Sequence, residues 1–445
     1  MIKFTLFFLS LSLLIILHEF GHYITARIFK ARVNKFYLFF DFFFPFATVF
    51  KFALFKKKIG DTEYGIGWFP FGGYVDIHGM QAEENADPNE KPAPDEFRGK
   101  KPYQRMIILA GGIIVNFLLA IIIYSMMAWA WGDEYFPAKN AKYGIYCDTL
   151  ALNLGLQNGD KILALDNKSV VDNDLHKTAL SVLLDRPKTI QFERNGVKKE
   201  ISISDDFAEK FLKKDARILF DAGFPFVIDS VVPGKGADRA GLKKGDKLIS
   251  LGKDSLEFFQ QFSTLLQFYK NKTVAIGFIR DGKTQTVNAN VDDDGKINVV
   301  PVGEEKFLQD TTISYGFFSA WGRGFVRTGE VLASYVKQFR LLFSKTGASK
   351  IGGFASIAKN YPDTWDWGAF WSITAFISVV LAFMNLLPIP VLDGGYILFV
   401  LWEMITGKKV SDKFMQRALT IGMYMILALL IFANGNDIIR AFSKK

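Results

Sequence analysis

Two histidines and a glutamate near the amino terminus form the clearest chemical pattern in the sequence. His18 and His22 are four residues apart, and Glu19 directly follows the first of them. If this stretch is helical, the two imidazoles lie on one face, where both can bind the same metal ion. The pattern His-Glu-x-x-His is typical of zinc sites in which the carboxylate acts as a general base in hydrolysis.

Two histidines do not complete a catalytic zinc site, which usually takes three protein ligands and a water molecule. The chain has four histidines and one cysteine, Cys147, so it can form neither a thiolate cluster nor an intrachain disulfide. His78 and His176 have no partner at ligand spacing. Residues 2–17 are almost entirely apolar, so the motif lies at the end of a segment that looks membrane-embedded. We therefore expect the third ligand to be a carboxylate at the same depth in the membrane.

Asp393 is the candidate for this third ligand. It follows an apolar run that contains Pro388 and Pro390, which break helix geometry, and two glycines come after it. Irregular backbone inside a membrane is tolerated where protein encloses it or where it lines a watery cavity. The alternative is an ordinary acidic residue at the membrane boundary.

These residues predict hydrolysis at a zinc ion. Zn²⁺ held by His18, His22 and Asp393 would lower the pKa of a bound water to about 7. Glu19 would take the proton of that water and pass it to the leaving amine, without being a ligand itself. Asn385, in the same apolar run as Asp393, would bind the substrate backbone or polarise its carbonyl group.

Four apolar segments must position these side chains. Half of the 445 residues are hydrophobic, which indicates membrane helices combined with soluble domains. Each segment has about the 20 residues needed to cross the hydrocarbon layer. The first is interpreted as a retained span, because no small-residue signal-peptide cleavage site follows it. The expected spans are residues 1–29, 106–132, 371–394 and 417–440.

The charges between these segments predict their orientation. Lys and Arg residues gather between the first and second segments and in the short loop after the third. The positive-inside rule makes that side, with the loop 30–105, cytoplasmic, so both termini and the long segment between the second and third spans lie outside. The net charge of +9 is explained in this way, and no basic run carries a nucleic-acid motif.

The long outer segment contains an internal repeat. Residues 155–165 and 241–251 share glycine, leucine, glycine, aspartate, lysine and a final leucine in the same register. Each copy predicts a helix end, a Gly-Asp turn and a strand, and it resembles the same stretch of PDZ domains. We therefore expect two PDZ-like α/β domains at 137–220 and 222–303, which bind peptides by strand addition. A generic turn repeat is the alternative.

Two further stretches accompany the candidate site. Residues 62–78 combine strand-forming residues with glycines, and we expect a membrane-associated β-hairpin there that clamps an extended substrate. Residues 313–345 mix aromatic and basic side chains, which predicts an amphipathic helix. This helix would lie on the membrane surface or pack against the PDZ-like domains. The phenylalanine-rich stretch 39–55 has no assigned role.

Together these motifs resemble the site-2 protease family, and the resemblance covers nearly the whole chain. It rests on the motif at 18–22, Gly72-Gly73-Tyr74-Val75, Asn116 in the second span and Asn-x-x-Pro-x-Pro-x-x-Asp-Gly at 385–394. The chain departs from the family at Gly112, where members usually have proline after Ala-Gly, and at Val380, where some members have asparagine.

The resemblance implies a polytopic α-helical protein of the bacterial inner membrane that acts as a zinc intramembrane metalloprotease, with its PDZ-like domains and both termini in the periplasm. The substrate would be a single-span anti-sigma factor or a remnant signal peptide, already trimmed by another protease. The PDZ tandem would exclude untrimmed substrates, with or without a peptide in its grooves. The residues expected to contact the substrate are Gly72, Gly73, Tyr74, Val75, Asn116 and Asn385.

Two other functions fit parts of the sequence. The first is a catalytically idle membrane scaffold that presents peptide ends through its PDZ-like domains. Glu19 speaks against it, because a scaffold has no need of a base beside two histidines. The second is a zinc-dependent membrane hydrolase of a non-peptide substrate.

Overall fold

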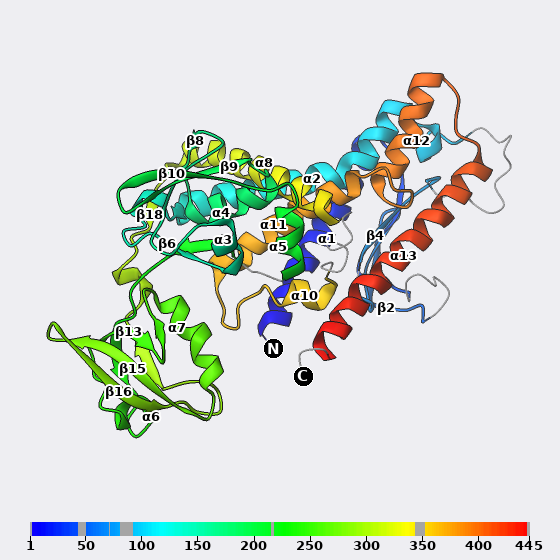
Figure 1. Cartoon of the computed structure of the whole chain (residues 1–445). Coiled ribbons are helices and arrows are strands. Elements are labelled where there is room, and N and C mark those ends of the chain that lie inside the picture. The colour runs from blue at the N-terminus through cyan, green and yellow to red at the C-terminus, as the bar shows by residue number, and fades with distance from the viewer. Residues whose placement is uncertain are drawn as a thin grey trace. The chain divides into compact units, whose positions relative to one another are not determined.

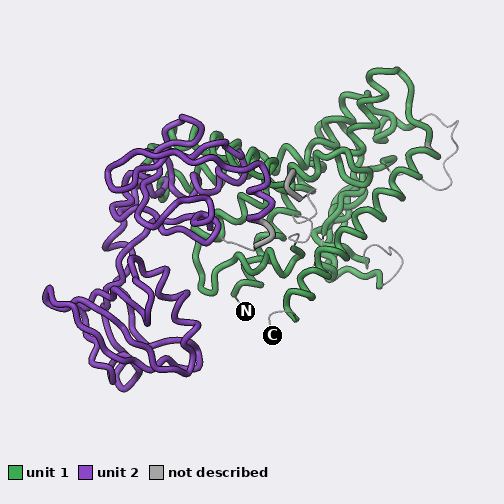
Figure 2. Tube along the Cα trace, viewed as in Figure 1, with its two compact units in different colours: residues 1–132, 314–445 green, residues 133–313 purple. Residues whose placement is uncertain are grey.

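The computed structural model of the chain describes residues 2–42, 50–70, 72–80, 92–214, 218–342 and 352–442. The contacts divide the chain into two compact units, which are unit 1 (residues 1–132 and 314–445) and unit 2 (residues 133–313) (Figure 2). Several predicted stretches lie partly outside the described residues. They are the first span at residue 1, the phenylalanine-rich stretch at 43–49, the expected hairpin at Phe71, the expected cytoplasmic loop at 81–91, the first PDZ-like domain at 215–217 and the expected amphipathic helix at 343–345.

Unit 1 contains four apolar helices that are long enough to cross a membrane, as predicted. They are α1 (Ile2–Ile28), α2 (Pro102–Ala130), α11 (Trp367–Leu386) and α13 (Asp412–Phe442) (Figure 1). Pro102 suits the first turn of α2, where a backbone N–H would have no partner inside the helix. Asp366 caps α11 by accepting a hydrogen bond from the amide of Ala369.

The third predicted span is not one continuous helix. α11 ends before Pro388, and a new helix, α12 (Asp393–Thr406), follows. The break arises because Pro388 and Pro390 cannot donate backbone hydrogen bonds and disfavour helical geometry in the residues before them. α12 ends at Gly407, which has the left-handed φ of 69°. The break in helix geometry expected at Pro388 and Pro390 is present, and Asp393 begins the second helix.

α2 contacts most of the other helices of unit 1, namely α1, α11, α12 and α8 (Phe317–Leu342). Val331 and Leu332 of α8 pack against buried side chains of α2, among them Ile123. A side chain at Gly324 would overlap Ser125 of α2, so glycine permits this close contact. α8 is the amphipathic helix expected at 313–345, and it packs along α2 and α11.

A short helix, α10 (Phe354–Ala358), precedes α11 and is tied to α13. Asp437 of α13 accepts hydrogen bonds from the amides of Gly353 and Ser356 over 3.0 and 2.9 Å. These are amides at the start of α10 that have no partner within the helix. Asp437 therefore acts as a cap supplied by another helix.

A four-stranded sheet of unit 1 contacts α1. Its strands lie in the order β2-β3-β1-β4, and their bounds are β1 (Val33–Leu38), β2 (Ala53–Ile59), β3 (Thr62–Gly67) and β4 (Tyr74–Ile77). β3 and β4 both pair with β1, which lies between them, so the expected hairpin at 62–78 is wrong. The hairpin is formed by β2 and β3, with Gly60 at a φ of 61° in the turn.

Unit 2 contains two copies of one α/β arrangement. The four-stranded sheet is ordered β10-β9-β7-β8 in the first copy and β16-β15-β13-β14 in the second. Each copy also has a two-stranded sheet, β6 with β11 in the first and β12 with β17 in the second. The first copy consists of β6 (Ile145–Cys147), α3 (Thr149–Leu154), β7 (Lys161–Leu165), β8 (Lys168–Ser169), α4 (Leu175–Leu184), β9 (Thr189–Arg194), β10 (Val197–Ser202), α5 (Phe207–Lys214) and β11 (Phe220–Ala222). The second consists of β12 (Ile228–Val231), α6 (Gly236–Arg239), β13 (Lys247–Leu251), β14 (Asp254–Ser255), α7 (Phe259–Leu266), β15 (Thr273–Arg280), β16 (Lys283–Asn290) and β17 (Val299–Pro301). A further pair, β5 (Asp133–Tyr135) and β18 (Thr311–Ile313), joins the two ends of the unit.

An equivalent ion pair occurs within each of the two copies. Arg194 donates to Asp160 from Nε over 2.7 Å, and Arg280 donates to Asp246 in the same way over 2.7 Å. The partners are 34 residues apart in both copies, and both aspartates are buried. Each aspartate belongs to the Gly-Asp turn of the predicted repeat. The repeat therefore corresponds to two structural copies, and the first extends through β11, beyond the boundary expected at residue 220.

The ion pair between His176 of α4 and Asp221 of β11 predicts that the stability of the first copy depends on pH. His176 Nε2 lies 3.0 Å from Asp221 Oδ1, and this hydrogen bond raises the pKa of His176 above its usual 6.5. The stabilisation should be complete below about pH 6.5 and disappear as the pH rises through the raised pKa. Because more than half of the His176 side chain is exposed, we expect the ion pair to contribute less than about 1 kcal/mol to the free energy of unfolding.

The measurement is thermal unfolding of the purified chain at a series of pH values. The unfolding midpoint of unit 2 should fall with rising pH more in the wild type than in His176→Gln. The same pH dependence in both proteins would contradict the prediction.

Candidate metal centre

The described structure brings the three predicted metal ligands together in unit 1. His18 and His22 come from the same face of α1, and Asp393 is the first residue of α12. The Nε2 atoms of His18 and His22 are 3.3 Å apart. Asp393 Oδ2 lies 3.3 Å from His18 Nε2 and 3.4 Å from His22 Nε2. The three atoms thus form a nearly regular triangle.

This triangle fits a zinc ion. Tetrahedral zinc with ligand distances of about 2.0–2.1 Å has ligand atoms about 3.3–3.4 Å apart, which agrees with all three distances. Asp393 Oδ2 is also buried without a hydrogen-bond partner among the described residues, a costly state for a carboxylate that binds nothing. The donor set of two imidazoles and one carboxylate leaves the fourth position of a tetrahedron free, as catalytic zinc requires.

The other ring nitrogen of each histidine has a partner on α2. Nδ1 of His22 donates to the carbonyl oxygen of Ile108 over 2.9 Å, which leaves the lone pair of Nε2 available for a metal. Nδ1 of His18 lies 3.2 Å from Nδ2 of Asn116, while Oδ1 of Asn116 is buried with no partner among the described residues. If the side-chain amide of Asn116 is flipped, its Oδ1 accepts a hydrogen bond from a protonated Nδ1 of His18. The lone pair of His18 Nε2 is then available for a metal as well.

Glycines allow α1 and α2 to approach closely at this point. A Cβ atom on Gly21 would overlap the backbone of Gly111, and one on Gly112 would overlap the rings of both His18 and His22. A larger residue at any of these positions would therefore push the histidines away from α2. The helix α2 passes through Gly111 and Gly112 without interruption.

Glu19 faces the edge strand β4. The amide of Val75 donates a hydrogen bond to its carboxylate, and a Cβ atom on Gly73 would contact its side chain. Gly73 also lies against the carbonyl oxygen of Tyr37 in β1, where only glycine fits. The predicted stretch at 72–75 therefore touches the proposed base directly.

Two other predicted substrate contacts have structural roles within the sheet of unit 1. Tyr74 donates to Asp41 Oδ1 over 3.0 Å and stacks on Tyr37, so its side chain is already engaged by neighbouring residues. A Cβ atom on Gly72 would overlap the ring of Phe40. Both residues shape the loop and strand that pass the site.

Asn116 and Asn385 differ in their availability to a substrate. Asn116 is fully buried and contacts His18, which favours a role in orienting the ring over the predicted contact with substrate. Asn385 lies in the last turn of α11 and is half-buried, and its side chain makes no hydrogen bond to any residue within the described ranges. Asn385 therefore remains available to a ligand.

The loop between α11 and α12 is strained. Val391 has a φ of 88°, a left-handed value that a β-branched side chain rarely adopts. Strain of this kind persists where the surrounding structure enforces it, and it gathers at functional sites. Here it occurs two residues before Asp393 and helps to set the direction in which α12 begins.

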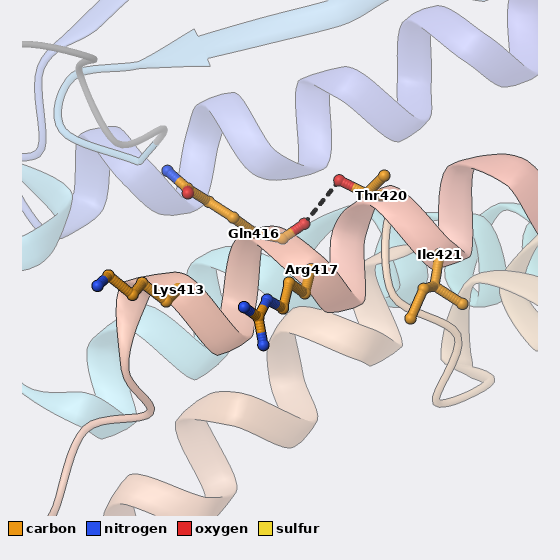
Figure 3. A pocket seen from close by; sticks show the side chains of 5 residues that line it. All are labelled: Lys413, Gln416, Arg417, Thr420 and Ile421. Carbon is orange, nitrogen blue, oxygen red and sulfur yellow. Dashed lines mark hydrogen bonds between the residues drawn. The ribbon is translucent and has the colours of Figure 1, made fainter.

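A separate cavity lies on α13. It has a volume of about 460 Å³ and is lined by Lys413, Gln416, Arg417, Thr420 and Ile421 (Figure 3). The first four of these side chains are polar or cationic, and none is a usual ligand of zinc. None of the predicted site residues lines this cavity, so it is not part of the candidate metal centre.

The sequence analysis did not predict an ion pair that joins α2 to α12, two helices of the candidate site. Arg105 Nη2 of α2 lies 2.6 Å from Glu403 Oε1 of α12, and both side chains are largely buried. The sequence does contain a signal for this pair. Arg105 is the only charged residue of α2, and Glu403 is the only charged residue of α12 besides Asp393.

Comparison with known proteins identifies the family. The sequence matches the family model described as peptidase family M50 over residues 6–429. The chain belongs to peptidase family M50. This is the family of the site-2 proteases, so the chain is a zinc-dependent intramembrane metalloprotease. The catalytically idle scaffold has no support from the comparisons.

Three similar proteins cover almost the whole M50 chain. A chain of Neisseria meningitidis serogroup A that is named as a zinc metalloprotease is 28% identical over 455 residues. The regulator of sigma E protease of Haemophilus influenzae is 25% identical over 455 residues, and the regulator of sigma-E protease RseP of Salmonella typhimurium is 26% identical over 460 residues. Each alignment covers 98% of both chains.

The contact between Asn116 and His18 predicts an effect on metal affinity. Asn116→Leu keeps a similar volume but removes the acceptor for His18 Nδ1, so the zinc affinity should fall about 10- to 100-fold. Asn116→Asp keeps an oxygen at this position and should retain most of the affinity. Competition between the purified protein and a chelator measures both variants. Wild-type affinity in the leucine variant would contradict the orienting role of Asn116.

Proposed function

We propose that His18, His22 and Asp393 hold the catalytic zinc ion of this M50 protease. The nearly regular triangle of their ligand atoms carries this proposal. Zinc, when bound, lowers the pKa of a water molecule and polarises a carbonyl group. The rest of the chemistry belongs to side chains of the chain itself.

Glu19 is proposed as the general base. It directly follows His18 on α1 and is half-buried, so its carboxylate lies next to the ligands without belonging to their triangle. The hydrogen bond from the amide of Val75 fixes its orientation. From this position Glu19 would accept a proton from the attacking water and deliver it to the leaving amine.

The edge strand β4 is proposed to hold the substrate in extended form. Among the residues that the structure describes, β4 pairs with β1 on one side only, so its other edge can accept a further strand. The peptide bonds of a membrane helix are hydrogen-bonded within the helix, and a protease must open that helix before it can cut. Strand addition to β4 would do so beside Glu19, and Asn385 would bind the carbonyl of the opened peptide.

The proposed substrate is a single-span membrane protein that another protease has already trimmed, such as an anti-sigma factor or a remnant signal peptide. The names of the relatives from Haemophilus and Salmonella support a link to sigma-E regulation. The two copies in unit 2 are proposed to be PDZ-like domains on the periplasmic side of a bacterial inner membrane, together with both termini. There they would exclude substrates that still carry a large outer domain.

Replacement of Glu19 tests the proposed base. Glu19→Gln keeps the size of the side chain but cannot accept the proton, so cleavage should fall at least about 100-fold while zinc stays bound. Asp393→Ala is the matched variant and should lose both cleavage and zinc. Co-expression with a tagged single-span substrate measures cleavage, and elemental analysis of the purified variants measures zinc. Equal cleavage by Glu19→Gln and the wild type would refute the proposal.

Deletion of residues 137–303 tests the proposed filter. The deletion keeps β5 and β18, whose pairing joins the two ends of the insertion, so unit 1 should retain its fold and its zinc. An untrimmed substrate should then be cut at a rate close to that of a trimmed one, as read from the two cleavage products in the same cells. Unchanged discrimination between the two substrates would rule out the filter.

A further inference from the structure

One face of α2 contacts every element that carries a proposed zinc ligand. Its residues Arg105, Ile108, Gly112 and Asn116 are three or four positions apart and therefore lie along one side of the helix. Ile108 binds His22, Asn116 contacts His18 and Gly112 lies against both rings. Arg105 is the only member of this row that contacts α12 through an ion pair.

The bilayer does not set the position of α12 along α2. With 14 residues, α12 is too short to cross a membrane, so the thickness of the bilayer does not fix its height. At its beginning it is linked to α11 by a loop that contains two prolines and the strained Val391. Asp393 occupies the first position of α12, and any lengthwise shift of the helix moves its carboxylate by the same amount.

The Arg105–Glu403 pair opposes such a shift. Glu403 lies ten residues after Asp393, about 15 Å along the helix axis. The distance between Arg105 Nη2 and Glu403 Oε1 is 2.6 Å, and Arg105 Nε also donates to the carbonyl oxygen of Lys100 over 3.2 Å. The side chains of Arg105 and Glu403 are only 9% and 13% exposed. Separating two buried charges is costly, so the pair defines one position of α12 more sharply than apolar contacts alone.

We propose that Arg105 and Glu403 are positioning residues, which fix α12 lengthwise on α2 and so place the carboxylate of Asp393 beside the two histidines. The pair acts through Asp393 and contacts neither metal nor substrate. This inference rests on the proposed ligand set of His18, His22 and Asp393. A pair that served folding alone would lower stability without changing the metal affinity of the folded protein.

The test measures metal affinity and stability separately in the full chain. Glu403→Gln should lower the affinity for zinc about 10- to 100-fold in a chelator competition, and it should alter the visible spectrum of the Co²⁺-loaded protein. The exchanged variant with Arg105→Glu and Glu403→Arg should recover a large part of the affinity. Lys3→Met, which breaks an exposed ion pair with Asp363 in the same unit, is the control and should bind zinc like the wild type.

The outcomes separate the two proposals. If Asp393→Ala loses zinc and the folded Glu403→Gln protein keeps wild-type affinity and the wild-type Co²⁺ spectrum, the positioning role is overturned while the ligand set stands. If Asp393→Ala keeps its zinc, the ligand set fails and the positioning role fails with it. Should Glu403→Gln not fold, Arg105→Lys replaces it, because it keeps both charges but loses the forked geometry of the guanidinium. Its zinc affinity should then fall below that of the wild type, and an unchanged affinity would overturn the positioning role.

Discussion

The close contact between α1 and α2 is the constraint on which the metal centre depends. At Gly21 and Gly111 the two backbones approach so closely that neither position has room for a side chain. This approach brings the ring of His22 to the carbonyl oxygen of Ile108 and the ring of His18 to Asn116. These polar contacts and the close packing through glycine together define the register of the two helices.

The proposed third ligand is positioned by a different kind of structure. Asp393 lies at the first position of a helix, where the unpaired amides and the helix dipole favour a negative charge. The two prolines before it are needed for this arrangement, because only a broken helix provides an amino-terminal end at the depth of the histidines.

Much of the site could be predicted from the sequence, because the chemistry of zinc ties residue type to spacing. The pair His18 and His22 and the isolated acid Asp393 are few, distinctive and surrounded by apolar residues. The topology of the sheet could not be predicted, since β1 separates two strands whose own sequence suggests a hairpin. The Arg105–Glu403 pair escaped notice because its members are 298 residues apart and each looks like an ordinary charge at the end of a span.

The pairing of β5 with β18 has a consequence for how this protein can evolve. It joins the points at which the chain enters and leaves unit 2, so the insertion is closed where it begins. The entropy of closing a loop depends only weakly on its length, and here the ends are already held together by strand pairing. Domains within the insertion can therefore be gained, lost or altered in sequence at little cost to the stability of unit 1. With the filter role proposed for unit 2, the selection of substrates and the chemistry of unit 1 can change independently in the same chain.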